Sequence, residues 1–432
     1  MIPNEPAAPG VPPVETPTAG GGRRRPWSGV DIPRRVAVLI MVVTLLGAVF
    51  SFLQTAASNR AADAARRGDG AAVRAQGEAA RAAAVISSQW RIWVLAAEDG
   101  QIAVSLEGAA DPNTAALAQA ARAGFLALTP FVDFDLFGEV GSEWQGLYAR
   151  AWSAPYREVE LQKAYTAERD GWGGKGKDYV AVVTVLAVAL FLIGLSRTPV
   201  AASSGPLLVG AGAGLAAVTA LLGLVVFLRP VAAPSPEAID AFVEGQVLFE
   251  SASDADGLRR AEEAFTTAIT VRAGYSDAFF WRGLTRSALD FSRPEGPAGS
   301  EGARDDFARV ASLDPLNAVA WNNLAAARFW LDDIDGALSA IRTSLKLEPG
   351  DLLANLNLAF FLAVEGDDAA YEAQLGWVRA VLDGGGVSAA TADLLLSQAL
   401  YLLDGAERHR PQYTAAIEQT RADLQALRAS MP

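Results

Sequence analysis

Three long runs of uncharged, apolar residues constrain this 432-residue chain more than any other feature of its sequence. They cover residues 36–53, 179–195 and 207–228. A helix rises 1.5 Å per residue, so each run nearly or fully crosses the ~30 Å hydrocarbon core of a bilayer. The first run follows a leader longer than that of a typical cleaved signal peptide, which favours an uncleaved anchor. We therefore predict three transmembrane helices.

The leader, residues 1–35, has the composition of a disordered tail. Its first 33 residues include eight prolines and five glycines, and such a segment cannot bury enough apolar surface to fold. The tail carries five arginines, which favour a cytoplasmic location. These are Arg23, Arg24, Arg25, Arg34 and Arg35.

The connection between the second and third runs permits only a tight hairpin in the membrane. Residues 54–178 and 229–432 must then share one compartment, opposite the tail. The arginines of the tail place both regions outside the cytoplasm, whereas Lys175, Lys177 and Arg229 favour the reverse. We expect a multi-pass plasma-membrane protein with both domains on the extracytoplasmic side.

Small residues line the third run at helical spacing. Gly210 and Gly214 are four residues apart, and Gly212, Ala216 and Ala220 form a neighbouring row. Small residues at this spacing let two membrane helices approach closely. The second run is the expected partner, and a homo-oligomeric contact through Gly210 and Gly214 is the alternative.

Residues 54–178 are rich in Ala, Arg and Glu, which predicts a helical, bundle-like loop domain. We expect a break at residues 68–70 (GDG) and a kink or boundary at Pro155. Aromatic residues lie at four-residue intervals on one helix face, where two tryptophans from an earlier helix could meet them. The aromatic residues are Trp144, Tyr148, Trp152 and Tyr156, and the earlier pair is Trp90 and Trp93. An aromatic core is the main interpretation, and a ligand-sensing pocket is the alternative.

The stretch GWGGKGKD, residues 171–178, resembles a phosphate-binding loop by pattern. It lacks the Ser or Thr that would bind magnesium, because Asp178 occupies that place, and no strand precedes it. We predict a flexible joint beside the membrane instead. Trp172, Lys175 and Lys177 suit the boundary between water and lipid.

Composition excludes several kinds of chemistry. The chain has no cysteine and one histidine, His409, so thiolate sites and two-histidine metal sites are ruled out. From residue 231 onward we count 30 acidic against 16 basic residues, a poor match for nucleic acid. Asp133 and Asp135 begin like a calcium loop, but the later ligands are missing. We expect no enzyme, cofactor or metal site.

The strongest pattern lies in the C-terminal half. The 34 residues 317–350 carry Trp321 and Leu324 in one helix, Ala337 in the next, and Pro349 at the end. This segment resembles a tetratricopeptide repeat (TPR), and neighbouring segments align over residues 236–380. Two further helices, at residues 388–403 and 410–430, are expected to cap the stack, so the predicted repeat domain spans residues 236–430.

The resemblance implies an α-solenoid whose first helices hold a partner peptide on their inner face. Carried over by repeat position, this face also includes Val319, Ala326, Leu353 and Leu356. The candidate partner-binding residues are Arg282, Arg286, Asn322, Phe329, Trp330 and Phe360. The alternative is that the aromatic rings pack against the next repeat and that the arginines pair with nearby acids.

Together these features predict an all-α protein with three transmembrane helices, a helical loop domain and a TPR-like solenoid. The order of elements in the N-terminal half resembles a family of small bacterial membrane proteins of unknown function, and that resemblance implies no activity. We expect a membrane-anchored scaffold or adaptor that binds an unidentified protein or peptide. The alternative is a sensor in which the loop domain binds a ligand and the repeats report it.

Overall fold

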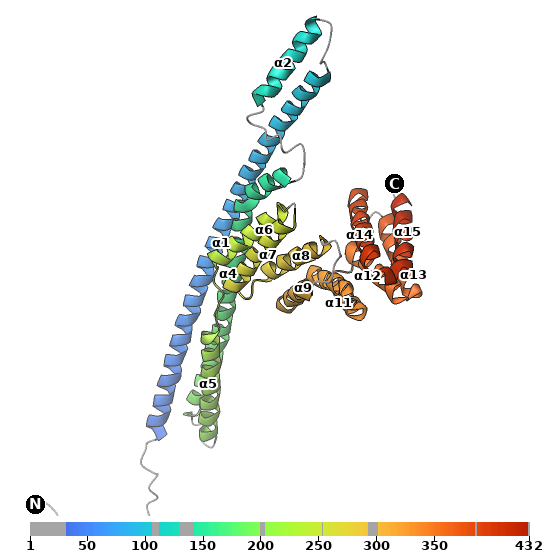
Figure 1. The fold of residues 1–432 in the computed structure, drawn as a ribbon. Coiled ribbons are helices and arrows are strands. Elements are labelled where there is room, and N and C mark those ends of the chain that lie inside the picture. Colours follow the sequence, from blue (N-terminus) through green and yellow to red (C-terminus); the bar gives the residue numbers. More distant parts are fainter. Residues whose placement is uncertain are drawn as a thin grey trace, which may run out of the picture. The chain divides into compact units, whose positions relative to one another are not determined.

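The computed structural model describes residues 32–105, 112–128, 142–198, 204–252, 254–292, 301–384 and 387–430. Within these residues the chain forms fourteen α-helices and one 3-10 turn, with no strand (Figure 1). The prediction of an all-α protein is confirmed. Residues 1–31 of the predicted tail lie outside the described part, as do Asp133 and Asp135, whereas residues 32–35 are helical. Contacts divide the chain into two units, residues 1–60 with 171–230 and residues 61–170 with 231–432, which we describe separately.

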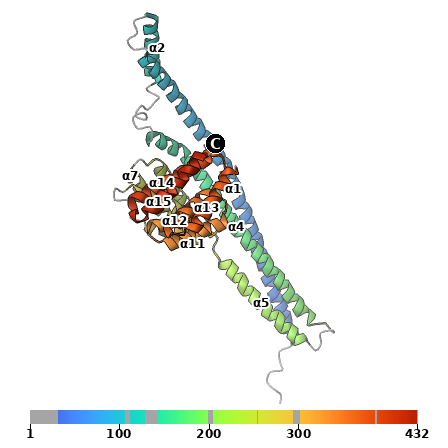
Figure 2. The same ribbon diagram turned by 90° about the vertical axis from the view of Figure 1, so that its right-hand side faces the viewer.

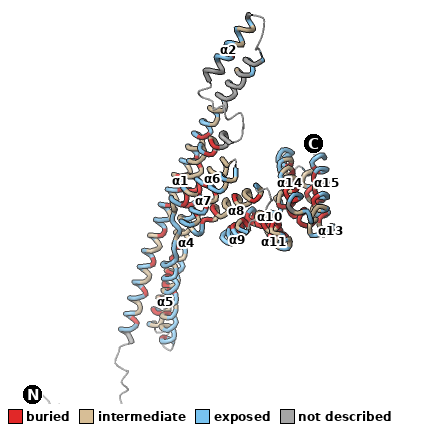
Figure 3. Tube along the Cα trace, in the orientation of Figure 1, coloured by how far each residue is buried: buried red, intermediate tan, exposed pale blue. Residues whose placement is uncertain are grey.

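The first unit contains the three predicted spans. They lie in helices α1 (Ile32–Ser105), α4 (Ser142–Leu195) and α5 (Gly205–Leu228), each long and apolar enough to cross a membrane. On α1 buried residues recur every seven positions, as in a coiled coil. Figure 3 shows them as separate buried patches along the helix. Those of the first unit are Val36, Val43, Phe50 and Ala57.

Helices α4 and α5 pair as the predicted hairpin. A Cβ atom built on Gly212 would lie 2.6 Å from Ile193 Cγ1 and 2.8 Å from the Ala189 carbonyl oxygen, so only glycine fits there. Gly210 and Gly214 are exposed, and a Cβ on either would meet nothing within 4 Å. The row that faces α4 is therefore the one containing Gly212, and Gly210 and Gly214 lie on the outer face.

The predicted flexible joint at residues 171–178 is wrong, because these residues are helical and continue α4 into the span. Side chains from this stretch join it to the end of α5. Lys175 Nζ donates a 3.1 Å hydrogen bond to the carbonyl of Phe227, and Arg229 forms a 2.9 Å ion pair with Asp178. The last carbonyls of a helix have no partner within the helix, so Lys175 caps α5. The Arg60 guanidinium lies over the ring of Trp172, with its Cζ atom 4.4 Å from the ring centroid.

In the second unit, helices α1 and α4 continue, and α2 spans Pro112–Leu128. The predicted break at residues 68–70 is absent. Gly68 instead lies against Tyr165 of α4, where a Cβ would be 3.4 Å from the Tyr165 Cβ, so this glycine permits close helix contact. Pro155 lies inside α4 and is not a boundary. The side chains of Trp90, Trp93, Trp144 and Tyr148 lie outside the described part, and the rings of Trp152 and Tyr156 are 6.2 Å apart.

Residues of α1 and α4 share a core with the start of the C-terminal half. Ala71, Leu161 and Ala164 belong to the same buried cluster as Phe242 and Phe265. Ion pairs and hydrogen bonds surround this cluster. They are Arg157–Asp240 (2.6 Å), Tyr156–Glu250 (3.1 Å), Lys163–Asp277 (2.9 Å) and Tyr275–Glu160 (2.8 Å). Helix α4 is thereby attached to the helices of residues 236–291.

Eight consecutive helices then pack as four hairpins (Figures 1 and 2). They are α6 (Pro236–Glu250), α7 (Ala255–Val271), α8 (Ser276–Phe291), α9 (Glu301–Leu313), α10 (Ala318–Trp330), α11 (Ile334–Leu347), α12 (Leu352–Glu365) and α13 (Asp368–Asp383). Five begin with an Asp or Asn whose side chain accepts a bond from a first-turn amide. These caps are Asp254, Asn317, Asp333, Asp351 and Asp367.

Small residues on the first helix of a hairpin receive an aromatic ring from the second. A Cβ on Gly245 would lie 2.6 Å from the Phe265 ring, and one on Gly283 would lie 2.8 Å from the Phe307 ring. In the third hairpin Ala325 and Ala337 are fully buried. The repeated pattern in the sequence thus corresponds to positions where two helices touch.

Candidate functional site

The two predicted arginines do not line an open groove. Arg282 makes a bidentate ion pair with Asp306, at 2.7 and 3.0 Å, and Asp306 is 3% exposed. Arg286 bonds the same carboxylate at 2.8 Å and Glu262 at 2.6 Å. Both guanidinium groups therefore join α8 to α7 and α9. The prediction that they present free donors to a partner is not met, because nearby acids use those donors.

The aromatic residues of the prediction do come together. The ring of Phe329 lies 5.0 Å from that of Phe360, 5.2 Å from that of Trp330 and 5.4 Å from that of Phe361, measured between centroids. Edge-to-face and offset contacts at such distances add to the stability that burial provides. Phe329 is 2% exposed, so this cluster is part of a core.

Asn322 lies on the same helix as Phe329 and is also buried. Its side-chain oxygen accepts a 2.9 Å hydrogen bond from the amide of Asn357 on α12. The pair satisfies polar atoms that would otherwise be costly to bury. Asn322 therefore holds α10 against α12.

The inner face of α10 and α12 is covered by the C-terminal helices of the same chain. These are α14 (Ala389–His409) and α15 (Thr414–Ser430), joined by the 3-10 turn Pro411–Tyr413. Both pack against α12 (Figures 1 and 2). They were expected to cap the end of the stack, and they cover its inner side instead. Helix α12 is consequently buried almost all round.

Four contacts fix this arrangement at its edges. A Cβ on Gly405 would lie 3.2 Å from the Phe291 ring, so α14 reaches as far back as α8. The Arg410 guanidinium donates to the carbonyl of Trp330, and the Tyr413 hydroxyl donates to Asp332. On the other side, the Tyr371 hydroxyl donates a 2.7 Å bond to Asp423 of α15. Burial and this bond raise the pKa of Tyr371, so it remains a donor.

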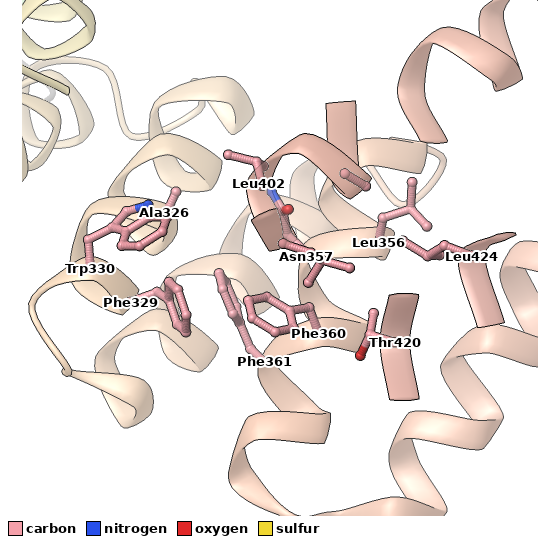
Figure 4. A pocket seen from close by; sticks show the side chains of 12 residues that line it. Ala326, Phe329, Trp330, Leu356, Asn357, Phe360, Phe361, Leu402, Thr420 and Leu424 are labelled. Atoms are coloured by element: carbon pink, nitrogen blue, oxygen red, sulfur yellow. The ribbon is translucent and has the colours of Figure 1, made fainter. Parts of the chain in front are cut away.

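A small cavity remains between the inner face and the C-terminal helices (Figure 4). It measures about 30 Å³, which is room for one or two waters and no larger ligand. Its lining contains five of the inner-face residues predicted from the sequence, together with residues of α14 and α15. The predicted five are Ala326, Phe329, Trp330, Leu356 and Phe360.

A second, open hollow lies between the start of α12 and the middle of α14. It measures about 400 Å³ and is lined by Leu353, Ser397, Gln398 and Leu402. Among the described residues, no group of three or more potential ligands could hold a metal ion. The lining of both cavities is mostly apolar and comes from helices that pack side by side.

The residues that cover the inner face were not identified as site residues from the sequence. The sequence does contain a pattern that could have pointed to them, because apolar side chains recur at intervals of three and four in both helices. The buried members are Ala392, Leu396, Ala399, Leu403 and Ala406 on α14, and Ile417, Leu424 and Leu427 on α15. Such a stripe predicts a buried helix face without naming the surface that buries it.

In comparisons with known proteins, no family model matches the chain, and no curated protein matches it significantly.

Proposed function

We propose that this protein is a membrane-anchored interaction scaffold of the TPR type. Helices α6 to α13 are the repeats, and the inner face of α8, α10 and α12 is the surface that takes a partner. The observation that carries the proposal is the apolar face of α10 and α12, which has two aromatic rings, Phe329 and Phe360, and already receives a helix from its own chain. A surface of this kind suits helix-in-groove recognition.

The repeat assignment is supported by contacts between motif residues. The indole of Trp321 donates a 3.0 Å bond to the carbonyl of Pro315, which joins the first helix of one repeat to the end of the preceding repeat. Trp281, at the matching position, packs edge-on against Phe249 with ring centroids 5.5 Å apart. Leu324, Ala325 and Ala337 are buried, as close helix packing in a repeat requires.

The membrane arrangement is part of the same proposal. The α4–α5 hairpin puts the segments before and after it on one side of the bilayer. We place the tail in the cytoplasm and both other regions on the extracytoplasmic face of the plasma membrane, on the strength of the tail arginines. The outer glycines, Gly210 and Gly214, offer a contact for a second copy.

The sensor alternative would need a ligand cavity among the loop helices. The two cavities described above lie among helices α10 to α15, which supports the scaffold.

The test is photo-crosslinking in native membranes from the inner face. Val319 suits a photoreactive residue, because the repeat register places it on that face and it is 47% exposed. The expected result is a discrete protein crosslinked from position 319 and not from Arg342, an exposed residue of α11. The same products from both positions, or none from 319, would contradict the proposal. Alanine at Phe329 or Phe360 is less suitable, because both are core residues.

A further inference from the structure

The regular stacking of hairpins stops at α13. Up to that point the second helix of each hairpin packs against the first helix of the next, as α11 does against α12. Helix α14 departs from this pattern and packs with α15 on α12. The sequence between α13 and α14 contains three successive glycines, residues 384–386, a residue type with the widest choice of backbone conformation. We call α14 and α15 together the C-terminal latch.

The latch meets the inner face as a helix and not as an extended segment. Leu396, Ala399, Leu403 and Ala406 form the buried stripe of α14, with large and small side chains alternating. Gly405, next to this stripe, also leaves room for aromatic rings. A Cβ there would be 3.2 Å from the Phe291 ring and 3.5 Å from the Trp330 ring.

Polar groups mark the end of the bound helix. Trp330 is the last residue of α10, and its carbonyl has no partner within the helix. Arg410, directly after α14, supplies that partner. Next to it, Asp332 has a left-handed backbone, with φ of 66°, and accepts the bond from Tyr413. A basic residue after the apolar stripe thus finds an acceptor at this end of the groove.

The latch does not fill the groove completely. The hollow of about 400 Å³ lies where α14 presents Ser397 and Gln398 towards Leu353 of α12. A helix with larger apolar residues at those two places would bury more surface than α14 does. A partner can thus bind the same face more tightly than the latch.

We propose that the partner of this groove is an amphipathic α-helix with a Leu-x-x-Ala-x-x-x-Leu-x-x-Ala stripe followed by a basic residue, and that the C-terminal latch competes with it within the chain. The inference rests on the proposed function and names its ligand and its regulation. Apparent affinity scales with the open fraction of the groove, so a latch that is closed 99% of the time weakens partner binding about 100-fold.

The experiment uses the full chain in detergent and a fluorescent peptide of residues 388–410 as the probe. Gly405→Leu forces α14 away from Phe291 and Trp330, while leucine favours the helix itself. Gly376→Leu is the matched control, because Gly376 is an exposed helical glycine with nothing within 4 Å of a built Cβ. We expect Gly405→Leu to bind the peptide at least about tenfold more tightly than the wild type and Gly376→Leu. Equal affinities, with proteolysis showing that α14 is released in Gly405→Leu, would overturn the proposal.

A second arm holds the latch closed. The sequence has no cysteine. In the double variant Leu353→Cys, Gln398→Cys, a short bis-maleimide can therefore react only with the two introduced thiols and link α12 to α14. Bridging should abolish the peptide binding that remains in the unbridged form. If the bridged protein binds the peptide as well as the unbridged form does, the latch proposal is wrong. This outcome does not depend on whether Gly405→Leu releases α14. If the latch is overturned but crosslinks from position 319 persist, the scaffold function stands. If those crosslinks are absent while the peptide results agree with the latch, only the scaffold function is rejected.

Discussion

The hydroxyl of Tyr275 donates a 2.8 Å hydrogen bond to Glu160, a carboxylate that is 5% exposed on helix α4. The same carboxylate accepts a 2.7 Å bond from Lys163, which also pairs with Asp277. This network joins α4, the helix that also contains the second candidate span, to the start of α8, the first helix of the second hairpin. It explains how an acid can be buried there, since two donors satisfy it.

Tyr275→Phe is expected to lower the free energy of unfolding of the full chain by about 1–2 kcal/mol, because Glu160 loses a donor in a buried place. Denaturation in detergent, followed by circular dichroism, measures the effect. Tyr156→Phe is the comparison, since its partner Glu250 is more exposed, and its loss should be smaller. An equal loss for both variants would contradict the role given to burial.

Alkaline pH should destabilise the protein through two buried tyrosines. Burial and the Glu160 carboxylate raise the pKa of Tyr275, and burial and the bond to Asp423 raise that of Tyr371. In the unfolded chain both titrate near pH 10, so their contribution is complete below about pH 10 and is lost as pH rises above it. The slope is about 1.4 kcal/mol per pH unit for each tyrosine. Tyr275→Phe, Tyr371→Phe should flatten the decline, and parallel curves would reject the explanation.

Asp306→Asn should be among the most damaging single changes in helices α6 to α13. It removes the carboxylate shared by Arg282 and Arg286 and leaves two half-buried guanidinium groups with fewer partners. We expect a loss of about 3 kcal/mol in unfolding free energy. Asp305→Asn is the adjacent control, because Asp305 pairs at the surface with Arg304, and it should cost under about 1 kcal/mol. Denaturant titration of the two variants measures both losses in unfolding free energy, and equal losses would contradict the role given to Asp306.

Gly212→Val should disrupt the membrane hairpin, whereas Gly214→Val should not. The first side chain would collide with Ile193 and the Ala189 carbonyl, and the second would project into open space. Melting temperature in detergent measures the difference. If both variants melt together, the packing face of α5 has been assigned incorrectly. Crosslinking of Gly214→Val in membranes also tests the proposed contact between copies, which this change should weaken.

Protease added to intact cells should cut the repeat region if it lies outside the cytoplasm. Fragments that end within residues 231–432 would identify such cleavage. Cleavage only after the cells are opened would place the repeats in the cytoplasm. The hairpin would then require the tail to be extracytoplasmic.

The sequence was most informative where one periodic pattern determines one structure. Uncharged runs predicted the spans, and the alternation of motif residues predicted the hairpins. It was least informative where a feature permits two outcomes. The glycines at 68–70 and 171–178 suggested breaks, but in the structure Gly68 and Gly176 let α1 and α4 approach within long helices. Their role depends on the neighbouring helix, which local sequence does not specify.

The candidate site shows the same limit. Repeat position placed Phe329 and Phe360 on the inner face, and five predicted residues line the cavity. Repeat position could not predict that Asp306, more than twenty residues from Arg282, would form ion pairs with both arginines. It also could not predict that the apolar stripe of α14 packs on α12, because an amphipathic pattern does not specify which surface buries it.

The latch leaves the ribosome after the helices that it covers. Helices α10 and α12 are complete while residues 389–430 are still being synthesised, so the rings of Phe329 and Phe360 are exposed to solvent during that interval. A nascent chain with such a surface is a target for chaperones and for aggregation. A stop codon just after residue 388 would make that exposure permanent, so loss of the latch would affect the protein's abundance as well as its binding.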